Sequence, residues 1–277
     1  YKAKTILAPM VHVNTLPFRI LARGYGADIV CSEEILDFRI EKCSRVENKS
    51  LGTIDFYYQG GREEVRAPTT VWRKRREPVV FQIGSCDAVA ALRGATVVCK
   101  DVKAIDLNCG CPKPFSVDRG YGAALVQKPD LLKDIVSTLS RNLPIPITAK
   151  IRLHHTLQGS MQLCKAVESG GGSAIAIHAR FTEDRPNVAA IPRAVLPLAN
   201  SVQIPVIYNG DGFNPRDLKS LLKKSGCDSI MLARGAMWNA SLFRTVGNGQ
   251  PMLPPYDVAR RYLKIAQRYE NSVENSR

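Results

Sequence analysis

Apolar residues in this chain fall into short runs that each end in a polar or glycine-containing turn. The runs are continuous rather than alternating, which is typical of parallel strands covered on both faces. Eight of them occur, at residues 5–10, 27–33, 78–84, 104–108, 147–152, 174–180, 205–210 and 229–235. The pattern therefore predicts eight buried strands.

Helical patterns separate most of these runs. Residues 129–143 carry apolar side chains at helical spacing behind Pro129, and a second helix is predicted from Pro215 to Gly226. Strands that alternate with helices eight times predict an α/β fold, the (β/α)8 TIM barrel. The alternative is a doubly wound open sheet. That fold would place a glycine-rich phosphate turn after the first strand, where this chain has Pro9-Met-Val-His12.

Residues 38–77 do not fit a plain barrel unit. Thr53-Ile-Asp-Phe-Tyr-Tyr58, two glycines and Glu64-Val-Arg-Ala67 together predict a β-ribbon insert. The insert ends in the basic run Trp72-Arg-Lys-Arg-Arg76. This run could hold phosphates and stack on a base, or it could be a solvated loop, and the sequence leaves both open.

A second departure from the barrel pattern begins at the breaker cluster Gly247-Asn-Gly-Gln-Pro251. Beyond it, Val258, Tyr262 and Ile265 lie on one face of a predicted helix. We therefore divide the chain into a barrel domain, residues 1–246, and the start of a C-terminal helical domain, residues 247–277. A helix that simply caps the barrel is the alternative.

The charge balance changes the picture of what the chain binds. It has 39 Lys and Arg against 25 Asp and Glu, a net charge of +14, while 45% of its residues are hydrophobic. A chain with so many apolar residues can form a substantial core, so the excess charge is expected on the surface. It favours a polyanionic partner. The alternative explanation of the positive charge is that the protein comes from a compartment or organism whose proteins are generally basic.

Cysteine usage predicts a reducing environment. The eight cysteines form no CxxC pair, and Cys109-x-Cys111 is poor spacing for a zinc site, so we expect no metal. No run of about 20 apolar residues or signal peptide is visible. We expect a cytoplasmic protein, with mitochondria as the alternative and a removed leader left open.

Polar residues gather where the predicted strands end, and in a TIM barrel such residues build the active site. The turn Asn108-Cys-Gly-Cys-Pro112 mounts a thiol on a rigid strand, and the glycine-rich stretch Arg119–Leu125 could act as a lid over it. Glycine turns at 209–212 and 233–235 leave backbone N–H groups free to hold a phosphate. Lys150 could neutralise an anionic ring, form a Schiff base or be structural. His178 could donate a hydrogen bond to a phosphate or substrate, or simply be a hydrogen-bonded residue of the core.

These residues stand in stretches that resemble the tRNA-dihydrouridine synthases, flavoenzymes that reduce a uracil ring in tRNA. The similarity extends from residue 5 to about 243, and the ribbon insert and Ala236-Met-Trp-Asn239 resemble the eukaryotic subtype that acts on D-loop uridine 20. The matching stretches are Leu7–Met10, Phe81–Gly84, Asp106–Lys113, Gly122–Leu125, Lys150–Arg152, Ile177–Arg180, Asn209–Gly210 and Ala233–Asn239.

The resemblance implies an FMN cofactor reduced by NADPH, which acts as the reductant, and tRNA as the partner. Reduced flavin would deliver hydride to C6 of uracil, and Cys111 would be the general acid that protonates C5. A free thiol is protonated at neutral pH and can supply that proton. The C-terminal helical domain would bind tRNA, and a larger ribonucleoprotein or protein complex is a further partner that the sequence leaves open.

The resemblance also assigns the binding residues. Asn108 and Arg180 would bind substrate, and Lys150 would meet the electron-rich edge of the flavin. The remaining flavin contacts would come from Pro9, Met10, Gln82, His178, Asn209, Gly210, Ala233 and Arg234.

Two positions depart from the family pattern. Arg119 replaces the first glycine of the lid, and Ala179 replaces a glycine after the histidine. These changes leave open a non-catalytic RNA-binding or ribonucleoprotein-assembly protein that retains the synthase fold. Other competitors are an FMN barrel for a small molecule, which the charge argues against, and an aldolase that uses Lys150 as a Schiff base.

Overall fold

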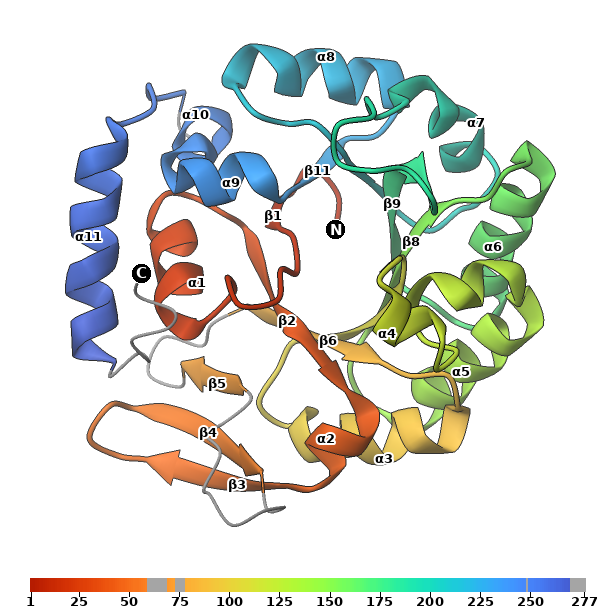
Figure 1. The fold of residues 1–277 in the computed structure, drawn as a ribbon, viewed down its shortest axis with the longest axis horizontal. Coiled ribbons are helices and arrows are strands. Elements are labelled where there is room, and N and C mark those ends of the chain that lie inside the picture. The colour runs from red at the N-terminus through yellow and green to blue at the C-terminus, as the bar shows by residue number, and fades with distance from the viewer. Residues whose placement is uncertain (59–68, 73–77, 248, 270–277) are drawn as a thin grey trace.

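Eight parallel strands close into a barrel, as Figure 1 shows down the shortest axis of the molecule. The computed structural model describes residues 1–58, 69–72, 78–247 and 249–269. Around the barrel the strands lie in the order β1-β11-β10-β9-β8-β7-β6-β2. Each barrel strand therefore pairs with the barrel strands that come before and after it in the amino-acid sequence. The strands are β1 (Thr5–Leu7), β2 (Ile29–Leu36), β6 (Val79–Gly84), β7 (Ala104–Cys109), β8 (Ile147–Leu153), β9 (Ala174–Phe181), β10 (Val206–Asn209) and β11 (Ser229–Leu232).

Closure of the barrel confirms the predicted TIM barrel and excludes the open sheet, because the first strand pairs with the last. Thr5 lies in register with Ile230, and Leu7 with Leu232. β1 ends earlier than its apolar run, since the chain leaves the strand before Pro9, which has no N–H to donate to a ladder.

Helices surround the barrel and cover the outer faces of its strands (Figure 1). The predicted helices at 129–143 and 215–226 are present, and Gly226 ends the second in the left-handed region at a φ of 69°. The helices and 3₁₀ turns of the barrel are α1 (Leu16–Gly24), α2 (Asp37–Glu41), α3 (Ala88–Val98), α4 (Pro114–Val117), η1 (Gly122–Gln127), α5 (Pro129–Asn142), α6 (Leu157–Ser169), η2 (Pro192–Ala194), α7 (Leu196–Ala199), α8 (Pro215–Ser225), α9 (Arg234–Trp238), η3 (Ala240–Leu242) and α10 (Phe243–Gly247).

The core has two parts. The larger part lies between the strands and the helices, and a smaller one fills the barrel with side chains such as Ile6, Val80 and Ile207. The buried Asp106 side chain lines a small cavity together with these same three residues. The Asp106 carboxylate accepts from Gln82 Nε2 at 2.8 Å and from Thr148 Oγ1 at 2.6 Å. Gln82, Asp106 and Thr148 are register neighbours on β6, β7 and β8, so the hydrogen bonds tie the three neighbouring strands together.

The insert forms a three-stranded antiparallel sheet outside the barrel, with β3 (Cys43–Asn48), β4 (Thr53–Tyr58) and β5 (Thr69–Trp72) in that order. The predicted strand at 53–58 is confirmed as β4, whereas β3 was not predicted. The predicted strand at 64–67 and the basic residues 73–76 lie outside the described residues.

The C-terminal helix α11 (Pro255–Arg268) packs against α1. The Tyr262 ring meets the Phe18 ring edge-on at 6.4 Å, and the Arg261 guanidinium lies 4.7 Å from the centroid of the Tyr25 ring. The division into two domains at residue 247 stays a prediction.

The linker before α11 is fixed to the barrel by side chains of the Ala236–Asn239 region and η3. Asn239 Nδ2 donates to the Leu253 carbonyl at 2.9 Å, and the Leu253 N–H donates to Ser241 Oγ at 2.8 Å. Within the part of the chain that the structure describes, no helix combines the length and apolar character that crossing a membrane requires.

Candidate active site

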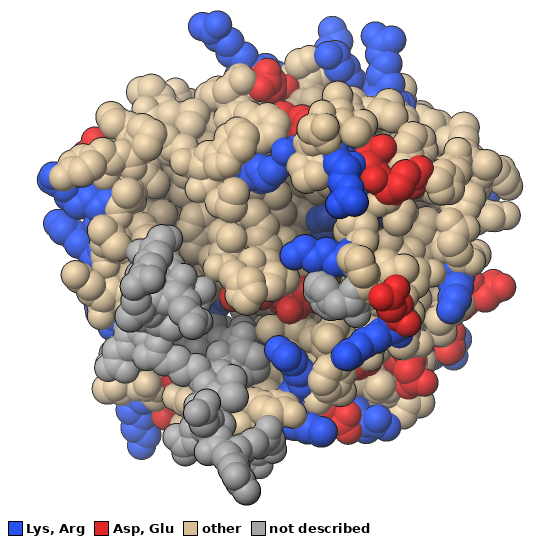
Figure 2. All heavy atoms as spheres, in the orientation of Figure 1, with Lys and Arg blue, Asp and Glu red and all other residues tan. Residues whose placement is uncertain are grey.

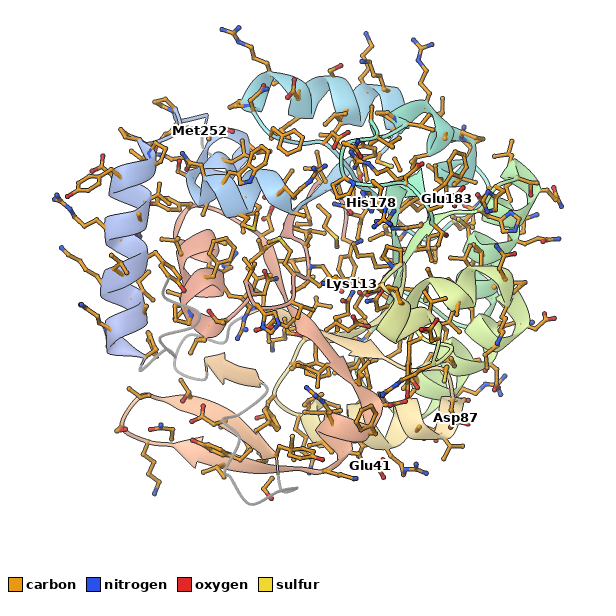
Figure 3. All side chains as sticks on the ribbon, in the orientation of Figure 1. Glu41, Asp87, Lys113, His178, Glu183 and Met252 are labelled. Carbon is orange, nitrogen blue, oxygen red and sulfur yellow. The ribbon has the colours of Figure 1, made fainter. Side chains whose placement is uncertain are left out.

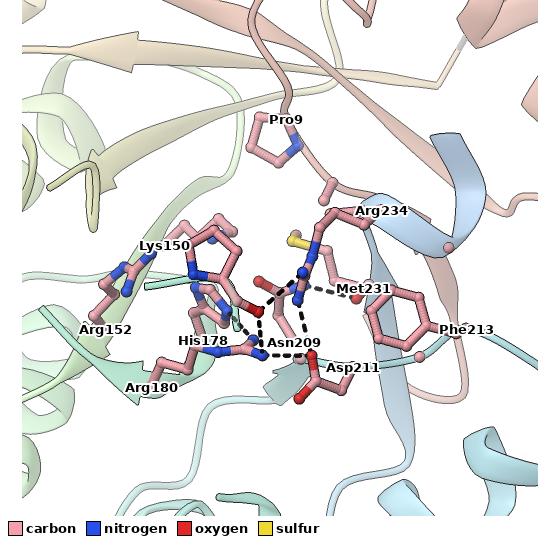
Figure 4. A pocket seen from close by; sticks show the side chains of 16 residues that line it. Pro9, Lys150, Arg152, His178, Arg180, Asn209, Asp211, Phe213, Met231 and Arg234 are labelled. Carbon is pink, nitrogen blue, oxygen red and sulfur yellow. Dashed lines mark hydrogen bonds and ion pairs between the residues drawn. The ribbon is translucent and has the colours of Figure 1, made fainter. Parts of the chain in front are cut away.

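A basic cavity of about 240 Å³ opens at the carboxyl ends of β1, β8, β9, β10 and β11. Figure 4 shows four cationic side chains, Lys150, Arg152, Arg180 and Arg234, around it. Among its described lining residues Asp211 is the one acidic side chain. Figure 2 shows Lys and Arg atoms around the hollow on the same face, so the mouth favours an anionic ligand.

Most of the residues predicted for the site line this cavity. They are Pro9, Lys150, His178, Arg180, Asn209, Gly210, Ala233 and Arg234. Met10, Gln82, Asn108 and Cys111 do not line it. Met10 follows β1, whereas Gln82, Asn108 and Cys111 belong to β6, β7 and the turn after β7, the sector of the mouth next to β8. The cavity volume lies below the roughly 300–1,000 Å³ of typical ligand pockets, so the cavity can hold part of a larger ligand.

Asp211 organises the cations, and the sequence analysis missed it. Its Oδ1 accepts from Arg180 Nη2 at 2.6 Å and from Arg234 Nη2 at 3.0 Å, while its Oδ2 accepts from the Ala190 N–H at 2.7 Å. Asp211 has a φ of 41°, within the left-handed region that non-glycine residues rarely adopt. The fold therefore accepts backbone strain at the residue that holds both arginines.

Arg180 is almost fully buried and donates to several protein acceptors. Besides Asp211, it donates from Nε to the Val188 carbonyl at 2.6 Å and lies with Nη1 3.1 Å from His178 Nε2. Its predicted role in substrate binding stays a prediction, because these contacts already engage the guanidinium.

His178 is neutral in this setting. Burial and then the positive charges of Lys150, Arg152, Arg180 and Arg234 lower the pKa of His178 to about 2. A guanidinium can only donate, so Nε2 of the imidazole accepts from Arg180 and the ring proton sits on Nδ1. His178 can therefore offer one N–H donor to a ligand without adding charge.

Lys150 projects from β8 into the cavity. Burial, followed by repulsion from Arg152, lowers the pKa of Lys150 to about 8, while the Asp106 carboxylate acts in the opposite direction. The Lys150 side chain therefore remains mostly protonated at neutral pH, although it loses its proton at a lower pH than an exposed lysine does. An anionic ligand next to the ammonium would favour the protonated form and raise the pKa of Lys150 again.

Cys111 sits on a turn whose shape is set by Asn108. The Asn108 Oδ1 accepts from the N–H groups of Gly110 at 3.0 Å and Cys111 at 3.2 Å. The side-chain amide oxygen of Asn108 thus shapes the turn, and the predicted role of Asn108 in substrate binding stays a prediction. Figure 3 places Lys113, from the same turn, near the centre of the mouth.

The glycine-rich stretch predicted as a lid closes onto this turn. The Ala123 N–H donates to the Cys111 carbonyl at 2.9 Å. Gly122 has a φ of 57°, and a Cβ there would lie 2.7 Å from the Cys111 carbonyl oxygen. Only glycine fits this close approach in that conformation.

The cavity fits a phosphate. Its cations supply charge, His178 supplies an N–H, and the loops after β10 and β11 approach so closely that a Cβ at Gly235 would lie 2.1 Å from the Gly212 carbonyl oxygen. These are the seventh and eighth strands of the barrel, whose loops often form the phosphate site in TIM barrels. The residues present therefore fit the phosphate end of FMN.

Comparison with known proteins matches nearly the whole chain to the family that the sequence motifs resemble. The model of the family described as dihydrouridine synthase (Dus) matches residues 6–277. A tRNA-dihydrouridine(20) synthase of Schizosaccharomyces pombe is 33% identical over 292 residues, covering 100% of this chain and 58% of that protein. One of Saccharomyces cerevisiae is 33% identical over 294 residues, covering 100% of this chain and 76% of that protein. Both names include NAD(P)+.

Solved structures share the fold at low sequence identity. A dihydroorotate dehydrogenase (DHODH) of Eimeria tenella in complex with ferulenol has a TM-score of 0.59 and 12% identity, covering 88% of this chain and 79% of that one. A variant of NCR from Zymomonas mobilis has a TM-score of 0.57 and 14% identity, covering 94% and 90%. At such identities these structures are evidence for the fold alone.

Proposed function

Because the chain belongs to the dihydrouridine synthase family, we propose that it reduces a uridine of tRNA to dihydrouridine, at position 20 of the D-loop, with bound FMN reduced by NADPH. The chain spans 58% of one named relative and 76% of the other, so their activity is extended to it as part of this proposal. The observation that carries the proposal is the basic cavity of about 240 Å³ beside the Cys111 turn at one barrel mouth.

The cavity residues divide the binding of FMN between them. Arg234 and the N–H of His178 would hold the phosphate together with the glycine turns at Gly210 and Gly235. The Lys150 ammonium would stabilise negative charge on the flavin ring. When bound, FMN supplies the hydride that adds to C6 of uracil.

Cys111 would complete the reduction. The Sγ–H bond breaks as its proton is transferred to C5 of uracil, and the thiolate that remains takes a proton from solvent. Asn108 keeps the backbone of the turn in place during this transfer because its Oδ1 accepts from the Cys111 N–H. Proton transfer from a positioned acid accelerates a reaction by roughly 10²–10⁴-fold.

Positive charge supports tRNA as the substrate. The net charge of +14 attracts a polyanion, and phosphate contacts position nucleic acid without reading its sequence. A D-loop uridine has to leave its stack before its ring can enter the mouth, by the logic of base flipping.

The visible absorption spectrum of the purified chain is the first test. A flavin spectrum, with FMN released on heating, is the expected result. Incubation with NADPH and an unmodified tRNA transcript should then add two hydrogens to one uridine, which mass spectrometry of nuclease fragments locates. Colourless protein that cannot be reconstituted with FMN would overturn the proposal and favour the non-catalytic RNA-binding alternative.

A further inference from the structure

A stack of two aromatic rings, with a guanidinium over one of them, lies at the edge of the basic cavity. The Trp238 and Phe213 rings are nearly parallel, with an interplanar angle of 19° and centroids 4.9 Å apart. The Arg234 guanidinium lies 5.1 Å from the Phe213 centroid. Phe213 follows β10, whereas Arg234 and Trp238 are the first and last residues of α9, so the loop after β10 and the short helix after β11 build the stack.

The stack joins the cavity to the outer surface. Phe213 and Arg234 line the cavity, as Figure 4 shows, whereas Trp238 is 62% exposed. Figure 1 places α9 beside β1 and β11 at the mouth. Single exposed apolar side chains are ordinary. This indole differs because it stacks on Phe213, which lines the basic cavity.

We propose that Trp238 is a stacking platform for a nucleobase of the tRNA that flanks the uridine in the pocket, an inference that rests on the proposed function. When one nucleotide leaves its stack, the faces of its neighbours lose their partners. An exposed, pre-oriented indole can replace such a partner, because every base has a π-face that stacks on aromatic side chains.

The charge distribution favours RNA as the source of that base. NADPH also carries an adenine ring, so the shared chemistry is a nucleobase next to phosphate. The net charge of +14 favours a polyanion, and exposed Arg216 lies in the first turn of α8, three residues after Phe213. We therefore assign the platform to tRNA and treat NADPH as an outcome of the test.

Fluorine NMR of the flavin-loaded chain tests direct contact. The chain has two tryptophans, Trp72 and Trp238, so 5-fluorotryptophan in a Trp72→Phe background reports on Trp238 alone. Unmodified tRNA is expected to shift this signal through the ring current of the stacked base, and saturating NADPH is expected to leave it in place. A signal that tRNA does not move, or that NADPH alone moves, overturns the proposal.

Binding and kinetics test the energetic role. Trp238→Ala is expected to weaken tRNA binding on the order of tenfold and raise KM for tRNA with little change in kcat. Trp238→Phe keeps a ring and should lose less. Met237→Ala is the matched control, because Met237 is the neighbouring α9 residue, is 43% exposed and lies outside the stack. Its tRNA affinity should stay within about twofold of wild type.

The outcomes separate this proposal from the proposed function. The NMR shift requires only binding, so a shifted signal without dihydrouridine formation would refute the synthase activity and support the platform. Normal tRNA affinity in Trp238→Ala would refute the platform and leave the activity untouched. A loss of flavin from Trp238→Ala, with unchanged tRNA affinity, would likewise refute it, because the stack would then serve the cavity alone.

Discussion

Asp211 holds the guanidinium of Arg180 with a 2.6 Å hydrogen bond from Nη2 to Oδ1. The arginine side chain is 3% exposed and the aspartate side chain is 24% exposed, so the ion pair is largely shielded from solvent. Removing one partner of a buried ion pair leaves the other charge without compensation.

We therefore expect Asp211→Ala to lower the free energy of unfolding by about 3 kcal/mol. Inorganic phosphate should restore part of this loss, because it can take the place of the carboxylate between Arg180 and Arg234. Thermal unfolding with and without phosphate measures both effects. Asp134→Ala makes the same charge change at an exposed position of α5. An equal response of the two variants to phosphate would contradict the assignment.

Lys150 gives a prediction about pH. Its folded-state pKa of about 8 lies below the ordinary 10.5, so the buried charge lowers stability wherever the lysine is protonated. In flavin-free protein, Lys150→Met should be more stable than wild type at neutral pH, by on the order of 1–3 kcal/mol. Between the two pKa values the unfolded chain binds the additional proton, so wild type gains stability as pH rises and the difference shrinks.

Urea unfolding across this pH range measures the difference between the two proteins. The matched control is Lys133→Met, at an exposed position of α5, whose stability difference from wild type should not depend on pH in this way. A Lys150→Met difference that stays constant from neutral pH to above 10.5 would show that the lysine pKa is not lowered in the folded protein.

Cys111→Ala is expected to slow dihydrouridine formation by at least roughly 100-fold, because the acid that protonates C5 is lost. The flavin spectrum should be unchanged, since Cys111 does not line the cavity that fits the phosphate. Cys99→Ala changes another partly exposed cysteine, at the end of α3, and should keep full activity. Wild-type turnover by Cys111→Ala would remove the thiol from the mechanism.

Gly122→Ala tests how closely the glycine-rich stretch approaches Cys111. The left-handed backbone alone should cost about 1–2 kcal/mol, and the new Cβ would also press on the Cys111 carbonyl oxygen. Gly249→Ala is matched for backbone, with a φ of 63° and no atom within 4 Å of its Cβ. Both variants should lose stability, but turnover should fall only in Gly122→Ala. If turnover is the same in the two variants, crowding of the Cys111 carbonyl oxygen by the new Cβ has no effect on Cys111 as the acid.

The barrel strands could be predicted because each is a continuous apolar run, a local property of the sequence. β3 could not, since Arg45, Val46 and Glu47 are exposed and the strand has no buried pattern. Its support comes from elsewhere. β4 supplies the ladder, and Asp101 accepts from Arg45 Nε at 2.7 Å across 56 residues.

The residues of the candidate site likewise fall into those that could be predicted from local sequence and those that could not. Cations and glycines at strand ends were predicted because the barrel brings strand ends together. Asp211 looked like an ordinary turn residue, since its partner Arg180 is 31 residues away. The Trp238 stack likewise depends on the loop after β10 and helix α9, which converge only in the folded protein.

The segment from Cys111 to Ala123 is closed on itself by the hydrogen bond between its two ends. Inside it, the Tyr121 N–H donates to the Ser116 carbonyl, and the Ser116 N–H donates to the Lys113 carbonyl. A loop closed in this way carries its own geometry, as Ω-loops do. It is therefore a natural unit for transplantation. Chimeras of related synthases should tolerate exchange of the whole loop, whereas a junction inside it would combine halves that no longer fit.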